Sequence, residues 1–217
     1  MNEDLVSRIV AVAIIILVAF PVHEFSHAYA AFRLGDSTAR YQGRLTLNPI
    51  VHFDPLGGTM LALSAIVGGF FIGWAKPTPV NPYNLRNGRR GEAIVSLAGP
   101  LSNLALAAIV AIPLRLILSN PELRFAVASN DIAEFALFVA LYFMDINIIL
   151  MIFNLLPIPP LDGWHTLLAL VNPRTAYTLR QFEQYGFILL LVFILAGAPV
   201  MGGLIRTIES ILLGVNF

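Results

Sequence analysis

Three side chains with metal-binding chemistry lie close together in FPVHEFSHAYA, residues 20–30. His23 and His27 are four residues apart, so on a helix both imidazoles lie on one face and can bind the same ion. Glu24 follows His23 directly and lies beside that face. This HExxH spacing is typical of a zinc site in which the glutamate acts as general base for a water that the metal activates.

The segment that carries this motif is strongly apolar, since it follows the run IVAVAIIILVAF at residues 9–20. An ionisable group at the centre of a membrane helix costs about 2.5–3.5 kcal/mol on the insertion scale, so it usually marks a functional site. The alternative is a chance match, with histidines at a helix end that faces lipid headgroups. We favour the metal site because the alternative needs two of only four histidines in this segment by chance.

Composition indicates a membrane protein. The 217 residues are 58% hydrophobic and 12% charged, whereas about 25% of the residues in an ordinary soluble domain are charged. The formal net charge is zero, which gives no support for nucleic-acid binding. The chain has no cysteine, so disulfides and Cys-ligated zinc are excluded, and any metal must be held by histidine and carboxylate.

Four apolar segments are each long enough to cross a hydrocarbon core of about 30 Å. They span roughly residues 5–34, 91–118, 132–156 and 182–204. We predict an all-α polytopic membrane protein with about four transmembrane helices. It is expected to form a single membrane-embedded domain over residues 1–217, with a three-helix core at about 5–165 and a C-terminal helix at about 182–213.

Basic residues gather in three of the links between these segments, which the positive-inside rule places in the cytoplasm. The HExxH end of the first segment and the C-terminal end of the third segment then face the cytoplasm together. Two polar clusters far apart in sequence therefore meet at one membrane level. The basic residues of the three links are Arg33, Arg40, Arg44, Lys76, Arg86, Arg89, Arg90, Arg174 and Arg180.

A further apolar segment, LGGTMLALSAIVGGFFIGW at residues 56–74, is barely long enough to span and contains two glycine pairs. Because two of the basic links flank it, we predict a Gly-rich re-entrant hairpin rather than a crossing. Irregular backbone at membrane depth must pack within protein or line a wet cavity, which the glycines suit. The alternative is a fifth full crossing, which would put four basic residues outside.

A catalytic zinc ion normally has three protein ligands and one open position, and HExxH supplies two. Asp162 is the best candidate for the third ligand. It lies in PPLDG, where prolines end the third apolar segment and Gly163 allows a tight turn. The alternative is that Asp162 only caps the helix that begins in the following WHTLLALV. Other candidates are His52, Asp54, Asp145 and His165.

These residues together resemble the site-2 protease family of intramembrane zinc metallopeptidases, which pairs an HExxH helix with an N-x-x-P-x-P-x-L-D-G motif on a later one. FNLLPIPPLDG at residues 153–163 follows that pattern, and SLAGPLSNLALA at 96–107 is similar to the family's middle core helix. LTLNPIVHFDPLGG at 45–58 is similar to a link in a compact bacterial and archaeal branch without PDZ or CBS domains. The likeness spans residues 20–165.

The resemblance implies a zinc-dependent endopeptidase that cleaves in or near transmembrane segments of membrane proteins. His23, His27 and Asp162 would bind one zinc ion. Glu24 would activate the water and pass its proton to the leaving amine. Asn154 would bind substrate backbone or the oxyanion, although it also fits a helix cap. The hairpin would pair with an unwound substrate by strand addition.

The expected partners are transmembrane substrates and the lipid bilayer, with no nucleic acid. The expected location is the cytoplasmic membrane of a prokaryote, with the active site toward the cytoplasm. Two other functions compete: a noncatalytic metal-binding membrane protein and a metal or solute transporter. The intact Glu24 argues against the first, because a structural site needs no base. The lack of a second copy of HEFSH or PPLDG argues against the second.

Four polar residues remain ambiguous at this stage. His52 fits a second-shell partner of the site, a fourth ligand, a gate residue or an interfacial loop histidine. His165 fits an interface anchor, and Asp145 matches no family pattern. Asn147 should lie at the same depth as Asn103 on an antiparallel helix, which predicts an interhelical hydrogen bond.

Overall fold

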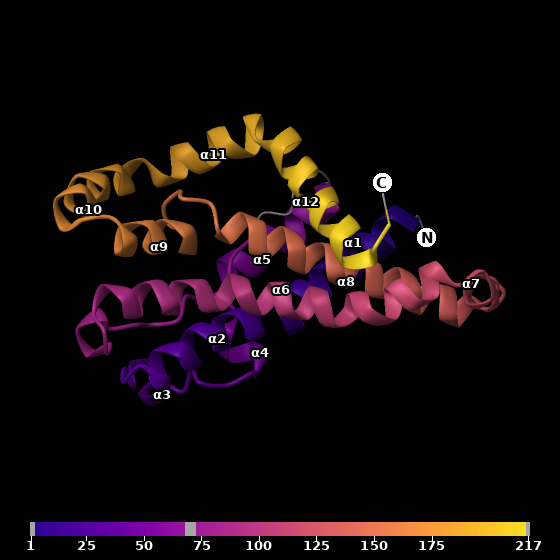
Figure 1. Cartoon of the computed structure of the whole chain (residues 1–217), viewed down its shortest axis with the longest axis horizontal. Coiled ribbons are helices and arrows are strands. Elements are labelled where there is room, and N and C mark those ends of the chain that lie inside the picture. The colour runs from indigo at the N-terminus through magenta and orange to yellow at the C-terminus, as the bar shows by residue number, and fades with distance from the viewer. Residues whose placement is uncertain (1–2, 68–72, 216–217) are drawn as a thin grey trace.

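The computed structural model describes residues 3–67 and 73–215, and within these ranges it contains helices and loops but no strand (Figure 1). Four stretches of helix within the described ranges are long and apolar enough to cross a membrane. The predicted all-α polytopic membrane protein is therefore confirmed. The four candidate spans are Arg8–Arg33, Arg89–Ser119, Asp131–Asn154 and Pro173–Ala196.

The first span is built from three consecutive helical elements. These are α1 (Glu3–Ile14), the π-helical turn η1 (Ile15–Ala19) and α2 (Phe20–Arg33). Pro21 lies in the first turn of α2 and supplies no N–H to the i→i−4 ladder. The wider turn just before it is the kind of π-bulge that often accompanies functional sites, and two turns of α2 then carry the HExxH motif.

The long helix α6 (Arg89–Ser119) is the centre of the molecule. It packs against α2, α8 (Asp131–Asn154), α9 (Asp162–Leu170) and α12 (Ala198–Leu213). Figure 1 shows α6 and α8 side by side along the long axis, with α2 and α9 on either side of α6. At the far end, α7 (Pro121–Ala128) connects α6 to α8. Helices α2 and α9, which carry His23, His27 and Asp162, therefore both pack on α6.

The segment predicted as a hairpin begins as helix α5 (Pro55–Val67). Its 13 residues span about 20 Å, which is shorter than a hydrocarbon core of about 30 Å. The chain returns beside its own start, because a Cβ on Gly57 would overlap the main-chain oxygen of Trp74. The two described arms thus have the form of a hairpin, while residues 68–72 lie outside the described residues.

An extended segment of residues 75–81, which we call the strap, runs from the hairpin along α2. The Lys76 N–H donates to the His52 carbonyl at 2.8 Å, and the Thr78 N–H donates to the Glu24 carboxylate at 2.8 Å. After the short helix η2 (Pro82–Asn84), the Arg86 N–H donates to the Leu34 carbonyl at 2.8 Å. Main-chain N–H groups of the strap are therefore bound to the His52 carbonyl and to the Glu24 side chain of α2.

Asp36 anchors the end of the strap from a fully buried position. Its carboxylate accepts hydrogen bonds from the main chain of Thr38 and Asn81 and from the Asn84 side chain. Burial raises the pKa of Asp36, but the hydrogen bonds from Thr38, Asn81 and Asn84 lower it by a larger amount in total. The pKa of this carboxyl therefore lies below its ordinary value. The ionised carboxylate therefore stabilises this corner of the fold.

We expect Asp36→Asn to destabilise the protein by about 1.5–3 kcal/mol, because an amide NH₂ would face the Asn81 N–H. The effect is present above the unfolded pKa of about 3.9 and is lost as the pH falls through the lower folded pKa. Denaturation in detergent at several pH values measures it. Glu122→Gln on exposed α7 is the control, and equal stability of Asp36→Asn and wild type at neutral pH would contradict the anchoring role.

The predicted helix over 182–204, and with it the C-terminal helix over 182–213, is wrong as a single element. After α10 (Pro173–Arg180) and a 3₁₀ turn at Gln181–Tyr185, helix α11 (Gly186–Ala196) ends and α12 begins after Gly197. A proline in the first turn of α12 supplies no N–H to continue the α11 ladder. Helix α12 turns back and packs on α6 and α8 (Figure 1).

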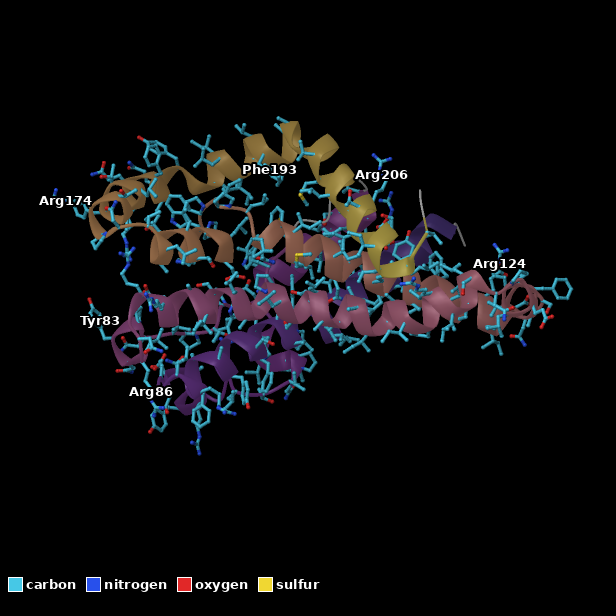
Figure 2. All side chains as sticks on the ribbon, in the orientation of Figure 1. Tyr83, Arg86, Arg124, Arg174, Phe193 and Arg206 are labelled. Atoms are coloured by element: carbon cyan, nitrogen blue, oxygen red, sulfur yellow. The ribbon has the colours of Figure 1, made fainter. Side chains whose placement is uncertain are left out.

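The basic links gather at one end of the molecule. Figure 2 shows Arg86 and Arg174 at the same end of the long axis and Arg124 at the opposite end. The C-terminal end of α2 and the N-terminal end of α6 lie at the Arg86 end (Figure 1). The links that the sequence places on one side of a membrane thus share one end of the fold.

Candidate metal centre

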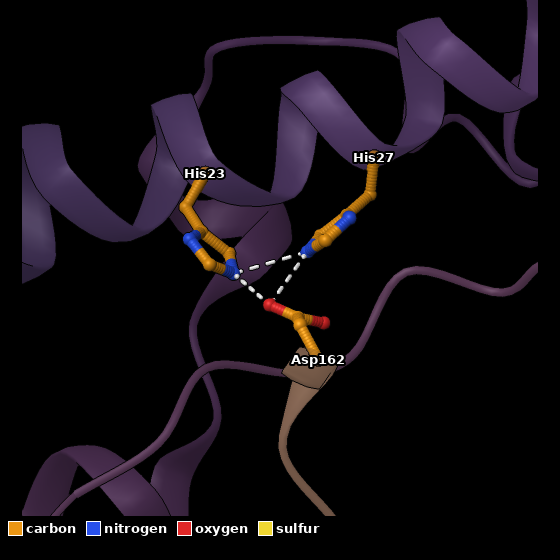
Figure 3. A group of neighbouring side chains, drawn as sticks. All are labelled: His23, His27 and Asp162. Atoms are coloured by element: carbon orange, nitrogen blue, oxygen red, sulfur yellow. Dashed lines mark hydrogen bonds and ion pairs between the residues drawn. The ribbon is translucent and has the colours of Figure 1, made fainter. Parts of the chain in front are cut away.

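Three side chains from two distant parts of the chain converge on one point (Figure 3). The Nε2 atoms of His23 and His27 are 3.0 Å apart. The Asp162 Oδ2 lies 3.1 Å from the His23 Nε2 and 3.3 Å from the His27 Nε2. Among the described residues, these three form the one group of histidine and carboxylate ligands placed to hold a metal ion.

Each of the three candidate ligands is placed by a feature of its own element. His23 and His27 lie one turn apart on α2 and are both 7% exposed. Asp162 is the first residue of α9, after the turn that follows α8. The N-cap of α9 is Leu161, without a side-chain capping bond, so capping does not account for Asp162. Its Oδ2 is buried and accepts no hydrogen bond.

The far side of each imidazole faces an oxygen. The His27 Nδ1 lies 2.7 Å from the Val95 carbonyl, and the His23 Nδ1 lies 2.7 Å from the Asn103 Oδ1. An oxygen acceptor in that position draws the ring proton to Nδ1 and leaves the Nε2 lone pair free. The two Nε2 atoms and one carboxylate oxygen then face one another at a single point.

This arrangement fits zinc. Neutral imidazoles and a carboxylate are zinc ligands, and ligand atoms around a tetrahedral zinc ion lie about 3.4 Å apart. The three separations here, 3.0, 3.1 and 3.3 Å, are close to that value. A cation at this point would be attracted by the carboxylate and by both Nε2 atoms.

Gly99 provides the space in front of the ligand atoms. A Cβ at this position would lie 2.6 Å from the His23 Nε2 and closer still to the His27 Nε2. Only a residue without a side chain lets α6 approach the two imidazoles this closely. The sequence singled out Gly99 only through the family motif, and the structure supplies the physical reason.

Glu24 lies beside the centre and is not one of its three ligands. Its Oε2 accepts the hydrogen bond from the Thr78 N–H at 2.8 Å, and its main-chain carbonyl accepts one from the Thr78 hydroxyl at 3.0 Å. The side chain is partly exposed. The strap therefore fixes one carboxylate oxygen of Glu24 and leaves the other available for chemistry.

Asn154 and His52 lie outside the three-residue group. Asn154, the last residue of α8, donates from Nδ2 to the Leu150 carbonyl at 2.9 Å. His52 is 1% exposed, and its Nε2 lies 2.7 Å from the Thr46 carbonyl. The substrate-binding role of Asn154 and the second-shell role of His52 stay predictions. His165 is exposed and Asp145 is partly buried.

Sequence reasoning missed Thr78 and Val95 as parts of the site. Val95 contacts His27 through its main-chain carbonyl, and Thr78 contacts the Glu24 carboxylate through its main-chain N–H, so side-chain identity carries no signal for either of these bonds. The predicted bond between Asn103 and Asn147 is confirmed at 2.9 Å. That Asn103 also contacts His23 was not foreseen, because the rotation of α2 against α6 cannot be read from either segment alone.

Comparison with known proteins agrees with this centre. Residues 10–133 and 117–197 match Peptidase family M50. A Bacillus subtilis (strain 168) protein named "Putative zinc metalloprotease YwhC" is 42% identical over 179 residues, which cover 82% of this chain and 77% of that protein. No solved structure matches the chain.

Two mycobacterial proteins named "Putative zinc metalloprotease Rip2" are less similar to this chain. Those of Mycolicibacterium smegmatis (strain ATCC 700084 / mc(2)155) and Mycobacterium tuberculosis (strain ATCC 25618 / H37Rv) are 32% and 35% identical. The matches cover 84% and 86% of this chain, and 65% and 66% of those two proteins. The chain thus spans slightly less than two thirds of the Rip2 proteins.

A bundle of membrane-length helices around two histidines and an aspartate is the architecture of a membrane metalloprotease. The chain belongs to Peptidase family M50. The resemblance to the site-2 protease family is thereby confirmed, and the names of the relatives imply zinc as the metal.

Proposed function

We propose that the protein is an intramembrane zinc protease that hydrolyses peptide bonds in or near the transmembrane segments of other membrane proteins. One zinc ion per chain is held by His23, His27 and Asp162. The observation that carries this proposal is the convergence of an Asp162 oxygen on two imidazole Nε2 atoms of a membrane-length helix, beside a carboxylate that is not in the group.

The depth of the centre supports a substrate within the membrane. His27 and His23 lie six and ten residues before Arg33, the end of α2. At 1.5 Å per residue, these distances are about 9 and 15 Å from the helix end. A centre at that depth is reached by a peptide bond of a membrane-embedded segment more readily than by one in a soluble domain.

The chemistry divides between the metal and the side chains beside it. When bound, zinc supplies the Lewis acid that makes water acidic enough to attack an amide near neutral pH. Glu24 accepts a proton from the attacking water and delivers it to the leaving nitrogen. The Thr78 N–H orients the carboxylate for both steps. Asn154, next to the turn that carries Asp162, hydrogen-bonds the substrate backbone or the oxyanion.

We place the protein in the cytoplasmic membrane of a prokaryote, with lipid and transmembrane substrates as its partners. The end that carries Arg86 and Arg174 faces the cytoplasm, in agreement with the positive-inside rule (Figure 2). Both α2 and α9 approach the centre from that end (Figure 1). The active site is therefore reached from the cytoplasmic half of the bilayer.

Zinc content tests the ligand set. We expect about one zinc per chain in detergent-purified wild type, because the three ligands complete a catalytic site, and much less in Asp162→Ala. His52→Gln should retain zinc, since the His52 Nε2 faces the Thr46 carbonyl rather than the three ligands. The measurement is metal per folded chain by mass spectrometry, with folding checked by size exclusion.

Two results would contradict this ligand set. Equal zinc in wild type and Asp162→Ala would remove Asp162 from the site, and loss of zinc only in His52→Gln would transfer its role to His52. A folded wild type that takes up no zinc would favour a noncatalytic membrane protein over the protease.

A further inference from the structure

A chain of buried hydrogen bonds leads from one metal ligand to a helix that carries none. The His23 Nδ1 contacts the Asn103 Oδ1 at 2.7 Å. The Asn103 Nδ2 donates to the Asn147 Oδ1 at 2.9 Å, and the Asn147 Nδ2 donates to the Phe143 carbonyl at 2.8 Å. Both asparagines are 0% exposed. The chain joins α2 to α8 through α6.

The direction of this chain is fixed at its far end. The Phe143 carbonyl can only accept, so Asn147 must present its NH₂ to it and its oxygen to α6. Asn103 must then turn its own NH₂ toward Asn147 and its oxygen toward His23. Reversing either amide would bring two oxygens or two NH₂ groups together, in a site without water access to relieve it.

The consequence for His23 is a single tautomer. Facing the Asn103 oxygen, the ring holds a proton on Nδ1, which leaves Nε2, the atom that faces Asp162, as the atom that can bind a metal. The His27 tautomer is fixed in the same way by a single contact, because the His27 Nδ1 faces the Val95 carbonyl directly. An asparagine amide alone could turn either way, so His23 needs the additional step to α8.

We propose that Asn103 and Asn147 are positioning residues that hold His23 in its metal-binding tautomer, with the Phe143 carbonyl as the fixed reference. The inference rests on the proposed function, since it assigns the asparagines a role toward zinc. Neither residue touches the substrate or reacting atoms. A purely structural bond between α6 and α8 would stabilise the bundle without any effect on His23.

Four variants separate these two roles. Asn147→Leu removes the link between Asn103 and the Phe143 carbonyl, so the Asn103 amide is free to turn. Asn103→Leu removes the acceptor from His23. Asn103→Asp keeps an acceptor for His23, as in the carboxylate–histidine–zinc arrangement, but breaks the bond to Asn147. Met144→Leu changes buried apolar packing on the same helix and is the control.

The first measurement is nitrogen NMR of zinc-free protein with ¹⁵N-labelled histidine, of which the chain has four. We expect the His23 Nδ1 to be protonated in wild type, Asn103→Asp and Met144→Leu. In Asn147→Leu and Asn103→Leu, the His23 signals should show the Nε2–H tautomer or a mixture.

The second measurement is zinc affinity by competition with a chelating dye. Loss of a partner outside the ligand set typically weakens metal binding by about 10–100-fold, and we expect that loss in both leucine variants. Asn103→Asp should stay close to wild type even though its stability falls. Rescue of zinc affinity without rescue of stability is a result that a structural role does not produce.

The outcomes distinguish this inference from the proposed function. Unchanged tautomer and zinc affinity in Asn147→Leu would overturn the positioning role and leave the protease proposal intact. Equal loss of affinity in Asn103→Asp and Asn103→Leu would also overturn it. If wild type binds no zinc, the proposed function fails, while the tautomer of His23 in the zinc-free protein still decides whether the asparagines set it.

Discussion

Replacement of Glu24 with glutamine should lower the cleavage rate by about 10²–10⁴-fold, the usual contribution of a general base, and leave zinc binding unchanged. Glutamine has the shape of glutamate and can still accept the Thr78 N–H through its oxygen. It cannot take a proton from water. The measurement is cleavage of doubly tagged single-pass membrane proteins in proteoliposomes, with zinc per chain determined on the same preparations.

The matched control for this experiment is Glu122→Gln on α7, where the side chain is exposed and far from the centre. It should cleave at the wild-type rate. Cleavage by Glu24→Gln at the wild-type rate would remove Glu24 from the mechanism. A wild type that binds zinc but cleaves nothing across a broad substrate panel would instead favour the noncatalytic alternative.

Gly99→Ala should abolish zinc binding in a protein that still folds. The added methyl group would lie where the two imidazoles present their Nε2 atoms. These rings are at the ends of side chains, so they can rotate away and relieve the overlap, but the three ligand atoms then no longer converge. Alanine is more favourable than glycine inside a helix by about 1 kcal/mol, so the substitution does not weaken α6 itself.

Gly202→Ala on α12 is the control for this substitution, because a Cβ there meets no atom within 4 Å. Zinc per chain and thermal unfolding of both variants measure the effect. A Gly99→Ala protein that keeps one zinc would show that the metal does not occupy the space in front of Gly99. Unfolding of Gly99→Ala without metal loss would assign the glycine to helix packing alone.

Features encoded within one continuous segment were predictable from the sequence. The first three spans follow from long apolar runs, and the pairing of His23 with His27 follows from helical spacing. Asp162 needed more, because a turn aspartate is ambiguous until the turn is placed against another helix. The family motif resolved it in advance, and the three converging ligand atoms now support it.

Features that depend on direction in space were not predictable. Hydropathy continues across Gly197 without a change, so the sequence suggested one helix where the structure has two that diverge. The contact between His23 and Asn103 depends on how α2 is rotated against α6. A pattern of residue types reports which face of a helix is apolar, but not which neighbour each polar side chain meets.

The strap places an unusual kind of constraint on Glu24, the proposed general base. Thr78 lies between Pro77 and Pro79, which have no N–H, so its amide is the one main-chain donor in that tripeptide. Every amino acid except proline carries this amide. The bond to the Glu24 carboxylate therefore does not depend on the side chain at position 78, whose hydroxyl adds a separate bond to the Glu24 main-chain carbonyl. A survey of substitutions at position 78 would therefore find that most are tolerated. The main-chain amide that orients the Glu24 carboxylate is kept in every variant except proline.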